Sequence, residues 1–504
     1  MFIRQKKNKS GKVSIQVIDK ANGKYTLAKT IGSSSDVSTL SKLMKEAEFW
    51  IEQKLGMKEL DFTQSDLLLE QLIDSIQQIK IVGTELLLGT LFDEIGFNVI
   101  EDELFRKLVL ARLCYPVSKL KTVDYLRRYE GYQTNEDDIY RYLDKLNKTQ
   151  KRTVEQISYA HTLKVLNNTI QIVFYDVTTL YFEIQQEDTL RKTGFSKEGK
   201  HQNPQIVLGL LVSTNGYPLA YEIYEGKKFE GDTLLPVINL FKRKYKLDDL
   251  VIVADAGLLS NKNITSLERN NYRYILGARI KNEKQSITTK ILSLNLKDGE
   301  SEVIEKSEQL RLIINYSQAR ARKDKANREK GIAKLEKQIK TNKLTKAQIN
   351  NKGYNKFLKM DGAVKISLDQ TKIDADKKWD GLKGYLTNTA LDKAQVIENY
   401  RHLWRIEKAF RVTKTDLKIR PIFHFAKRRI EAHICITFVA YKIYKELDRR
   451  LKELQSTLSP EKAIEIAKTI YGITATKPHS KQVFEKTLIT NEEQRNLARL
   501  FNLV

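Results

Sequence analysis

Two short runs of apolar, mostly β-branched residues, each ending in an aspartate, constrain the fold of this 504-residue chain more than any other feature. Residues 170–175 read IQIVFY and lead into Asp176, and residues 250–254 read LVIVA and lead into Asp255. Nearly continuous apolar runs of this length are typical of strands that are buried on both faces. Open α/β sheets place functional side chains at their strand ends. The two runs therefore predict an α/β domain with both aspartates at one edge of its sheet.

The segments around these two runs predict the order of the sheet elements. Asn215-Gly216 separates apolar residues 206–213 from 218–224, which is a good signal for a β-hairpin. Helical stretches near 233–244 and 261–270 alternate with the strand ending at Asp255 and with a strand near 274–278. The predicted order is β-β-β-α-β-α-β, in which the first three strands are antiparallel and sequential.

A third carboxylate lies in residues 400–418, YRHLWRIEKAFRVTKTDLK, which contain no Pro or Gly and are predicted to form one helix. On such a helix, the side chains that project close to the direction of Glu407 are those of Tyr400, Trp404, Arg411 and Lys414. Alone, this pattern also fits an exposed helix with ion pairs. With two strand-end aspartates, however, Glu407 completes a set of oxygen ligands suited to two Mg²⁺ ions and to phosphoryl transfer.

The composition indicates a polyanionic partner. Lys and Arg number 88 against 63 Asp and Glu, which gives a formal net charge of +25 and favours nucleic acid, with solubility or a membrane surface as the alternative. The two cysteines lie in apolar helical contexts and suggest neither disulfides nor a zinc site, which fits a reducing cytoplasm. No apolar run approaches 18 residues and no secretory signal is evident, so we expect no membrane span.

With Tyr400 and Lys414, the three carboxylates Asp176, Asp255 and Glu407 resemble the catalytic set of DDE transposases with an RNase H-like fold. They are most similar to the bacterial insertion-sequence subgroup with the signature Y-x2-R-x3-E-x6-K. The signature arginine is replaced by Leu403, with Arg401 and Arg405 on either side. Further stretches that resemble this subgroup are residues 194–200, 205–226, 274–281, 380–389 and 417–441.

The resemblance implies an α/β protein. Its catalytic core would be an RNase H-like (retroviral integrase-like) mixed sheet with a β-rich and helical insertion, and its N- and C-terminal regions would be all-α. About 150 residues separate Asp255 from Glu407, too many for a structureless loop, so an inserted domain is expected there. The expected regions are an N-terminal β-hairpin (1–35), a helical DNA-binding region (36–168), the first part of the core (169–281), the inserted domain with a basic helix (282–378), the second part of the core (379–451) and a C-terminal helical region (452–504).

Each of three basic segments fits two interpretations, DNA binding or a structural role. The hairpin near the N-terminus could contact DNA phosphates or serve only in packing. Short helices around Gly131 could form a helix-turn-helix reader of duplex DNA or an ordinary helical domain; the basic residues there are Lys119, Lys121, Arg127, Arg128 and Arg141. The helix predicted from Ser317 to about Lys343 could contact DNA or form half of a solvated helical hairpin.

The resemblance also implies a function. Two Mg²⁺ ions, which Mn²⁺ can replace, would bind Asp176, Asp255 and Glu407, and the protein would cut transposon ends and join them to target DNA. The implied DNA contacts are Tyr400, Arg401, Arg405, Arg411 and Lys414. Trp379 and Trp404 would stack on an unpaired base, with core packing as the alternative. The implied partners are terminal inverted repeats, target DNA and a second copy of the chain, in the cytoplasm of a bacterium at the nucleoid. The alternatives are a nuclease of the same fold without strand transfer and a non-catalytic DNA-binding relic or regulator.

Overall fold

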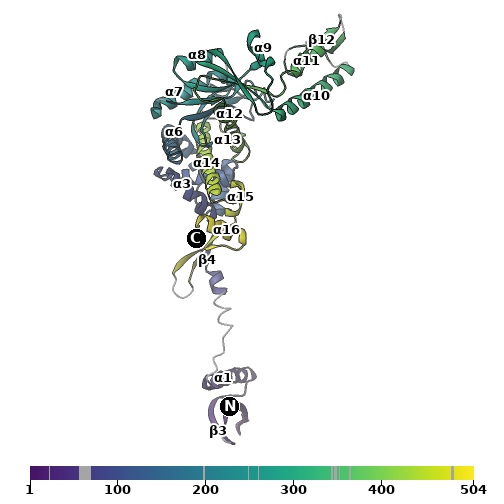
Figure 1. Ribbon diagram of the computed structural model, residues 1–504. Coiled ribbons are helices and arrows are strands. Elements are labelled where there is room, and N and C mark those ends of the chain that lie inside the picture. Colours follow the sequence, from purple (N-terminus) through teal and green to yellow (C-terminus); the bar gives the residue numbers. More distant parts are fainter. Residues whose placement is uncertain are drawn as a thin grey trace. The chain divides into compact units, whose positions relative to one another are not determined.

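A computed structural model describes residues 1–21, 23–55, 70–184, 186–196, 199–247, 249–258, 260–341, 344–345, 349–350, 352–361, 365–477 and 482–503 (Figure 1). The chain divides into two compact units. One contains Met1–Gln78 and Ile473–Lys486, and the other contains Ile79–Gly472 and Thr487–Val504. Among the described residues, no helix has the length and apolar character needed to cross a membrane.

The first unit begins with a three-stranded antiparallel sheet, β1 (Phe2–Lys7), β2 (Val13–Ala21) and β3 (Lys24–Ser34), followed by α1 (Val37–Leu55). Alternation along β2 buries Ile15 and Val17, which pack with Ala47 of α1. Strands β2 and β3 form the hairpin that the sequence indicates, and β1 adds a strand that the sequence reading lacked.

An eight-stranded sheet in the order β10-β11-β14-β9-β8-β5-β6-β7 is the centre of the second unit. Its strands are β5 (Ile172–Tyr181), β6 (Gln205–Ser213), β7 (Pro218–Glu225), β8 (Val251–Ala254), β9 (Arg273–Ala278), β10 (Ser301–Ser307), β11 (Leu310–Tyr316) and β14 (Leu382–Thr387). β5, β6 and β7 are antiparallel neighbours, whereas β8 is parallel to both β5 and β9. With α7 (Leu234–Tyr245) and α8 (Asn261–Arg269) between the strands, the predicted β-β-β-α-β-α-β order of an RNase H-like fold is confirmed.

Helices cover both faces of this sheet, which explains why its central strands are apolar on both sides. On one face, Tyr175 of β5 packs in a cluster with residues of α7, α8 and α9 (Gln285–Ser293). On the other face, the preceding residue Phe174 belongs to a cluster with residues of α13 (Trp404–Thr415) and α14 (Lys427–Glu453). Figure 1 shows α7 and α8 on one side of the sheet and α12 (Lys393–Arg401), α13 and α14 on the other.

The expected inserted domain is only partly separate. Strands β10 and β11 were assigned to the insertion from the sequence, but they extend the central sheet. β11 pairs with β14 and β10 pairs with β11, and their residues 303–304 and 312–314 are apolar enough to join the core. The remaining segment has a small apolar cluster of its own around Leu335 and Phe357. Its elements are α10 (Gln318–Lys340), η7 (Gly353–Phe357), β12 (Leu358–Asp361), β13 (Lys365–Leu368) and α11 (Gln370–Lys377). The basic segment forms the helix α10, and residues 342–343 at the end of its predicted span lie outside the described residues.

Two regions that were expected to be wholly helical contain strands. The helices are α3 (Thr90–Ile95), α4 (Glu103–Cys114), α5 (Lys119–Tyr129), α6 (Glu136–Val165), α15 (Pro460–Ala467) and α16 (Glu492–Phe501), with the π-helical turn η1 (Glu85–Gly89) and the short 3₁₀ turn η2 (Phe97–Val99). However, β4 (Ile76–Ile81) forms a sheet of order β16-β15-β4 with β15 (Tyr471–Thr476) and β16 (Val483–Leu488). The all-helical expectation is wrong for these residues, because β4 finds its partner β15 almost 400 positions later and no local pattern reveals such pairing.

Candidate active site

The two strand-end aspartates lie side by side on the sheet. β5 and β8 are parallel neighbours, and their register pairs Tyr175 with Ala254. Asp176 and Asp255 therefore take the next position on adjacent strands, which are about 4.8 Å apart in a sheet. By alternation, Asp176 shares a face with Phe174 and Asp255 with Val253. Both apolar residues belong to the cluster that includes α13, so both aspartates face the side of the sheet that carries this helix.

Glu407 lies on α13, and the helix packs through its opposite side. Ile406, Ala409 and Phe410 are buried in the same cluster as Phe174 and Val253, while Glu407 is exposed. Trp404 and Arg411, three and four positions from Glu407, share its exposed side of α13, and Lys414 follows seven positions after Glu407 in a half-buried place. The helix therefore presents the predicted carboxylate, together with one arginine and one lysine, beside the edge where the aspartates end.

The single helix predicted for residues 400–418 is two helices, α12 and α13, that meet at His402 and Leu403. Leu403 is 6% exposed and belongs to the core. The break allows Tyr400 to be buried while Glu407 stays exposed, whereas one straight helix would point both in nearly the same direction.

Tyr400 is nevertheless a direct neighbour of the predicted site. Its hydroxyl donates a hydrogen bond of 3.0 Å to Oδ1 of Asp255. Its ring meets the ring of Tyr385 edge-on, with centroids 4.9 Å apart, and Lys383 Nζ lies 4.3 Å from its centroid. Burial and then the charge of Asp255 raise the pKa of Tyr400, so the phenol stays protonated and donates.

Lys383 of β14 connects Asp255 electrostatically with Glu407. Burial, and then the charge of Arg320, lowers the pKa of Lys383, while Asp255 and Glu407 both act against this shift. The same two carboxylates also contribute to the raised pKa of Tyr400. Asp255 and Glu407 are therefore close enough to influence the same two side chains, although they are 152 positions apart in the sequence (407 − 255).

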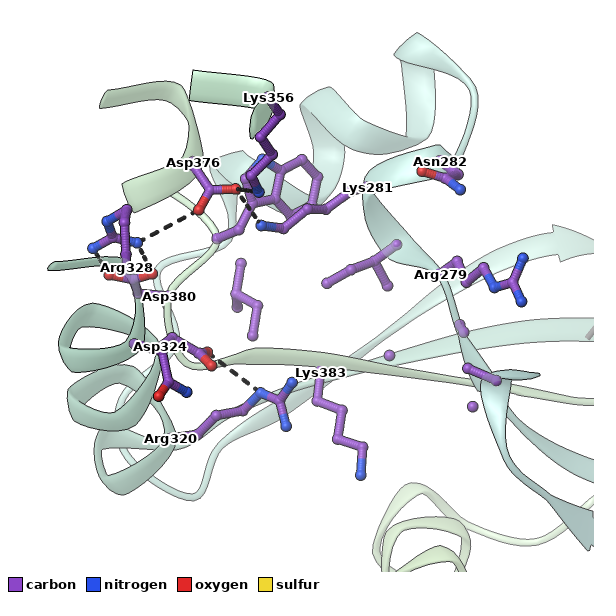
Figure 2. A pocket seen from close by; sticks show the side chains of 18 of the residues that line it. Arg279, Lys281, Asn282, Arg320, Asp324, Arg328, Lys356, Asp376, Asp380 and Lys383 are labelled. Atoms are coloured by element: carbon purple, nitrogen blue, oxygen red, sulfur yellow. Dashed lines mark hydrogen bonds and ion pairs between the residues drawn. The ribbon is translucent and has the colours of Figure 1, made fainter. Parts of the chain in front are cut away.

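A cavity of about 710 Å³ opens beside Asp255 and Tyr400 and extends to the inserted segment (Figure 2). Several of its basic residues are held by acids. Arg328 of α10 bonds Asp380 in a bidentate pair at 2.5 and 2.6 Å, and Lys281 and Lys356 meet at Asp376 at 2.7 and 2.8 Å. The Arg328–Asp380 pair fixes α10 to the turn before β14, and the pairs at Asp376 fix α11 to Lys281 and to Lys356 of η7. Among the described residues, neither Lys383 nor Arg279 forms a salt bridge; both line the cavity, and Lys383 has the charges of Asp255 and Glu407 nearby.

The two predicted tryptophans lie at different cavities. Trp379 is half-buried, packs against the core and lines the cavity beside Asp255. Trp404 is 52% exposed and lines a second cavity of about 280 Å³ together with Arg405 and Lys408. Core packing therefore does not account for Trp404, whose ring is open to a ligand.

The three arginines predicted to bind DNA also lie in different parts of the structure. Arg411 is exposed on the Glu407 side of α13. Arg401 lines a further cavity near β10, and its charge contributes to the lowered pKa of Lys383. Arg405 lies at the Trp404 cavity, where its NH1 is 3.5 Å from Asn215 Oδ1.

Sequence reasoning missed three residues of this site. Lys383 lies in β14, within the stretch 380–389 that resembles the transposase subgroup. A lysine beside the buried Gly384 of the same strand was the sequence signal that could have identified it. Gly277 of β9 leaves room for Tyr400, since a Cβ there would lie 2.3 Å from the phenol oxygen. Glu230 of η3 (Glu230–Asp232) is a further acid, because a Cβ on Gly257 would lie 3.9 Å from both Glu230 Oε2 and Asp255 Oδ2. Neither of these last two had a local sequence signal.

The donor chemistry of the site fits a divalent cation only in part. Carboxylate oxygens are the ligands that Mg²⁺ and Mn²⁺ prefer, and Asp176 and Asp255 are adjacent in register. Within the part of the chain that the structure describes, however, no three Asp, Glu, His or Cys side chains are arranged closely enough to hold a metal ion. The backbone thus brings the ligand-bearing elements together, whereas the side chains are not in a coordinating arrangement.

Comparison with known proteins identifies the family of this chain. A search of proteins with curated descriptions found no match. Among solved structures, the chain is similar to a piggyBac transposase synaptic complex with hairpin DNA, at 10% identity over 77% of this chain and 78% of that one, with a TM-score of 0.38. It is also similar to a Mos1 transposase paired-end complex with the left transposon end (12% identity, 36% and 57% covered, TM-score 0.16) and to a Mos1 mariner paired-end complex with Mn (13%, 36% and 57%, 0.15).

These TM-scores are below 0.5, so we draw nothing from the structural likeness. The family model described as the transposase DDE domain is different, because it matches residues 167–443, which is more than half of the chain. This match contains the central sheet, Asp176, Asp255 and the helix of Glu407. The chain therefore belongs to the family of transposases with a DDE domain.

Proposed function

We propose that this protein is a cut-and-paste DNA transposase that cleaves transposon ends and joins the freed 3′ ends to target DNA. The observation that carries the proposal is the placement of Asp176 and Asp255 at matching positions of adjacent strands, on the side of the sheet that carries Glu407. We assign Asp176, Asp255 and Glu407 as the ligands of two Mg²⁺ ions, which Mn²⁺ can replace. Bound there, the ions would activate the attacking oxygen and stabilise the leaving 3′ oxygen of the phosphodiester.

The side chains around the carboxylates position the DNA. Tyr400 fixes the orientation of Asp255 through its hydrogen bond. Lys383, which lies close to both Asp255 and Glu407, offers its positive charge to a phosphate oxygen. Arg411 shares the exposed side of α13 with Glu407, Lys414 follows on the same helix in a half-buried place, and both would bind the backbone on either side of the cleaved bond. Arg401 and Arg405 would contact phosphates further along the strand.

The positive charge of the inserted segment supports a DNA path across the cavity beside Asp255. Exposed basic residues of α10 continue from this cavity along the helix; they are Arg322, Lys323, Lys325, Lys330, Lys334, Lys337 and Lys340. Trp404, with its ring exposed beside Arg405 and Lys408, would stack on a base that leaves the duplex near the cut. Trp379 is assigned the same role on the side of the larger cavity.

The reaction consists of two displacements at phosphorus. Water attacks the phosphodiester at the transposon end, the bond to the 3′ oxygen breaks, and a 3′-hydroxyl and a 5′-phosphate are formed. The 3′-hydroxyl then attacks a target phosphodiester, a new bond to its 3′ oxygen forms and the target strand is cut. Moving the whole element requires both of its ends to be joined to one target, so we propose that two copies of the chain act together on terminal inverted repeats. We place this reaction in the bacterial cytoplasm, where the buried thiols of Cys114 and Cys435 remain reduced.

The test begins with the DNA that flanks the coding region, where short inverted repeats are expected. Purified protein with Mg²⁺ should cut these repeats at their ends and should join pre-cut ends to a target plasmid. Cleavage without joining would identify a nuclease of the same fold. Binding to the repeats without any cleavage in Mg²⁺ or Mn²⁺ would identify a DNA-binding relic or regulator.

A further inference from the structure

A separate cavity of about 190 Å³ lies between α4, the first turn of α5, α14 and the segment after α13. None of the proposed metal ligands lines it. The residues that give it its character are Arg112, Ser118, Lys119, Phe423, His424 and His433. Lys119 was expected to face DNA on the surface of a helix-turn-helix, yet it is buried here. The second helix of that motif, α6, is also 30 residues long rather than short.

Two cations are buried in this cavity without acidic partners. Arg112 and Lys119 are each 6% exposed. Among the described residues, neither forms a salt bridge, and the hydrogen-bond partner of the Arg112 guanidinium is a ring nitrogen, Nδ1 of His433 at 3.4 Å. Burial alone lowers the pKa of Arg112 to about 10, and burial with the charge of Arg112 lowers that of Lys119. A buried cation with no counter-charge is costly, so binding of an anion at this place would be favourable.

The neighbouring histidines and acids do not provide that negative charge. Nε2 of His433 lies 3.0 Å from the carbonyl oxygen of Ile419, and its Nδ1 faces Arg112, which assigns the neutral tautomer with the proton on Nε2. Burial lowers the pKa of His424 to about 3, so it is neutral too. Glu136 lines the cavity and is hydrogen-bonded to Tyr140, and its one negative charge cannot balance both buried cations.

Asp144, the other acid that acts on His424, is already bound by two arginines. Arg428 and Arg429 each donate to it from Nε at 2.7 Å. The charge of Asp144 is therefore balanced by its own two arginines. Among the described lining residues, Glu136 is the acid left beside two buried cations, which keep an excess of positive charge.

We propose that this cavity is a binding site for one phosphate group, held by Arg112 and Lys119 at the N-terminal end of α5. The helix dipole adds to the attraction, since α5 begins at Lys119 with Ser118 as its cap. Phe423 lines the same cavity and is 64% exposed, so its ring is available to a base attached to the bound phosphate. The site therefore favours a phosphodiester of DNA, a source that rests on the proposed function, over a free phosphate ion.

The proposal predicts an unusual combination of stability and binding. A Lys119→Met or Arg112→Met substitution removes an uncompensated buried charge while filling similar volume. Without phosphate, either variant should melt at a temperature equal to or above that of the wild type. If these side chains had a purely structural role, the same substitutions would lower the melting temperature. Each variant also tests the cavity independently, so one suffices if the other does not melt cooperatively.

The experiment titrates the full chain with inorganic phosphate at constant ionic strength, in the absence of DNA and metal, by calorimetry. The matched control is Lys290→Met, which removes one exposed lysine of α9. Wild type and control should bind phosphate alike, and Lys119→Met and Arg112→Met should each weaken binding by about tenfold or more, as expected for a hydrogen bond to a charged group. Equal phosphate binding in all four proteins, or none in the wild type, would overturn the proposal.

Duplex DNA then identifies the source of the phosphate. If it is the DNA backbone, Lys119→Met should reduce the slope of log K against log salt by about one, and Lys290→Met should not. An unchanged slope together with lost phosphate binding would assign the site to free phosphate. Because the calorimetry requires neither DNA nor catalysis, its failure is distinguishable from a failure of the proposed transposase activity.

Discussion

The hydroxyl of Tyr400 donates a 3.0 Å hydrogen bond to Oδ1 of Asp255, although the two residues are 145 positions apart and lie on a helix and at a strand end. Asp255 is exposed and would otherwise be free to rotate. The bond leaves Oδ2 of the carboxylate available and fixes its direction. We therefore regard Tyr400 as a positioning residue for Asp255, and not as a residue that carries the reaction.

Replacing Tyr400 with Phe should lower the rate of end cleavage by about tenfold. A hydrogen bond to a charged group contributes about 1.5–3 kcal/mol, and the exposure of Asp255 places the effect near the lower limit. The Phe ring keeps the contact with Tyr385, so the melting temperature should change little. Tyr385→Phe is the control, since it alters a phenol on the same wall without removing the bond to Asp255. Equal rates for the wild type and Tyr400→Phe would show that the bond is not used.

Gly277→Ala should interfere with the same contact from the other side. Its Cβ would lie 2.3 Å from the Tyr400 oxygen and 3.0 Å from the backbone nitrogen of Ala256, so the phenol must move. Cleavage should fall at least as much as in Tyr400→Phe. In the double variant Gly277→Ala/Tyr400→Phe the phenol oxygen is absent. The loss of cleavage, expressed as an activation free energy, should therefore be smaller than the sum of the losses in the two single variants. Fully additive losses would indicate that Gly277 acts elsewhere.

Deprotonation of Lys383 should lower the rate of cleavage at alkaline pH. Burial lowers the pKa of this lysine, so it loses its proton, and with it its attraction for a phosphate, at a lower pH than an ordinary lysine. The rate should therefore fall as the pH rises through this lowered pKa. In Lys383→Arg the charge persists, and the plateau should extend to higher pH. Lys383→Met should be slower at every pH. An alkaline limb that is the same in wild type and Lys383→Arg would contradict this role.

Trp404 should contribute to activity but not to stability. Its ring is about half exposed, so Trp404→Ala should leave the melting temperature nearly unchanged. Loss of stacking on a displaced base should slow cleavage by about tenfold, from the 1–3 kcal/mol of base–aromatic stacking, and Trp404→Phe should restore most of the rate. The rates of the three proteins on a repeat-end duplex check this. Inactivity of Trp404→Phe at the level of Trp404→Ala would indicate that stacking is not its role.

The central sheet could be predicted because its signals are local. The β-branched runs before Asp176 and Asp255, and the Asn215-Gly216 turn, each predict a strand or a hairpin by their own residues. The register of β5 with β8 comes from the structure, because runs that are apolar on both faces do not specify it. The strand pairings that the sequence does not reveal join residues far apart in the chain. β10 and β11 join the sheet only through β14, and β4 pairs with β15 near the other end of the chain.

The candidate site was predictable in its acids but not in its supporting residues. Glu407 and Tyr400 stand out by spacing, yet the same spacing suggested one helix, because nothing local shows that Leu403 must enter the core. Lys383, Gly277 and Glu230 gain their meaning only from what the fold places opposite them. The same holds for Lys119, whose basic side chain suggests a surface contact until its burial next to Arg112 is seen.

The central claim is that Asp176, Asp255 and Glu407 act together on the phosphodiester, and cleavage of the flanking inverted repeats in Mg²⁺ tests it most directly. Asp176→Asn, Asp255→Asn and Glu407→Gln should each reduce cleavage by at least about a hundredfold while DNA binding persists, since a metal site supplies several kcal/mol of charge stabilisation. Glu308→Gln, an exposed acid between β10 and β11, should cut like the wild type. Near-wild-type cleavage by any one of the three variants would contradict the account.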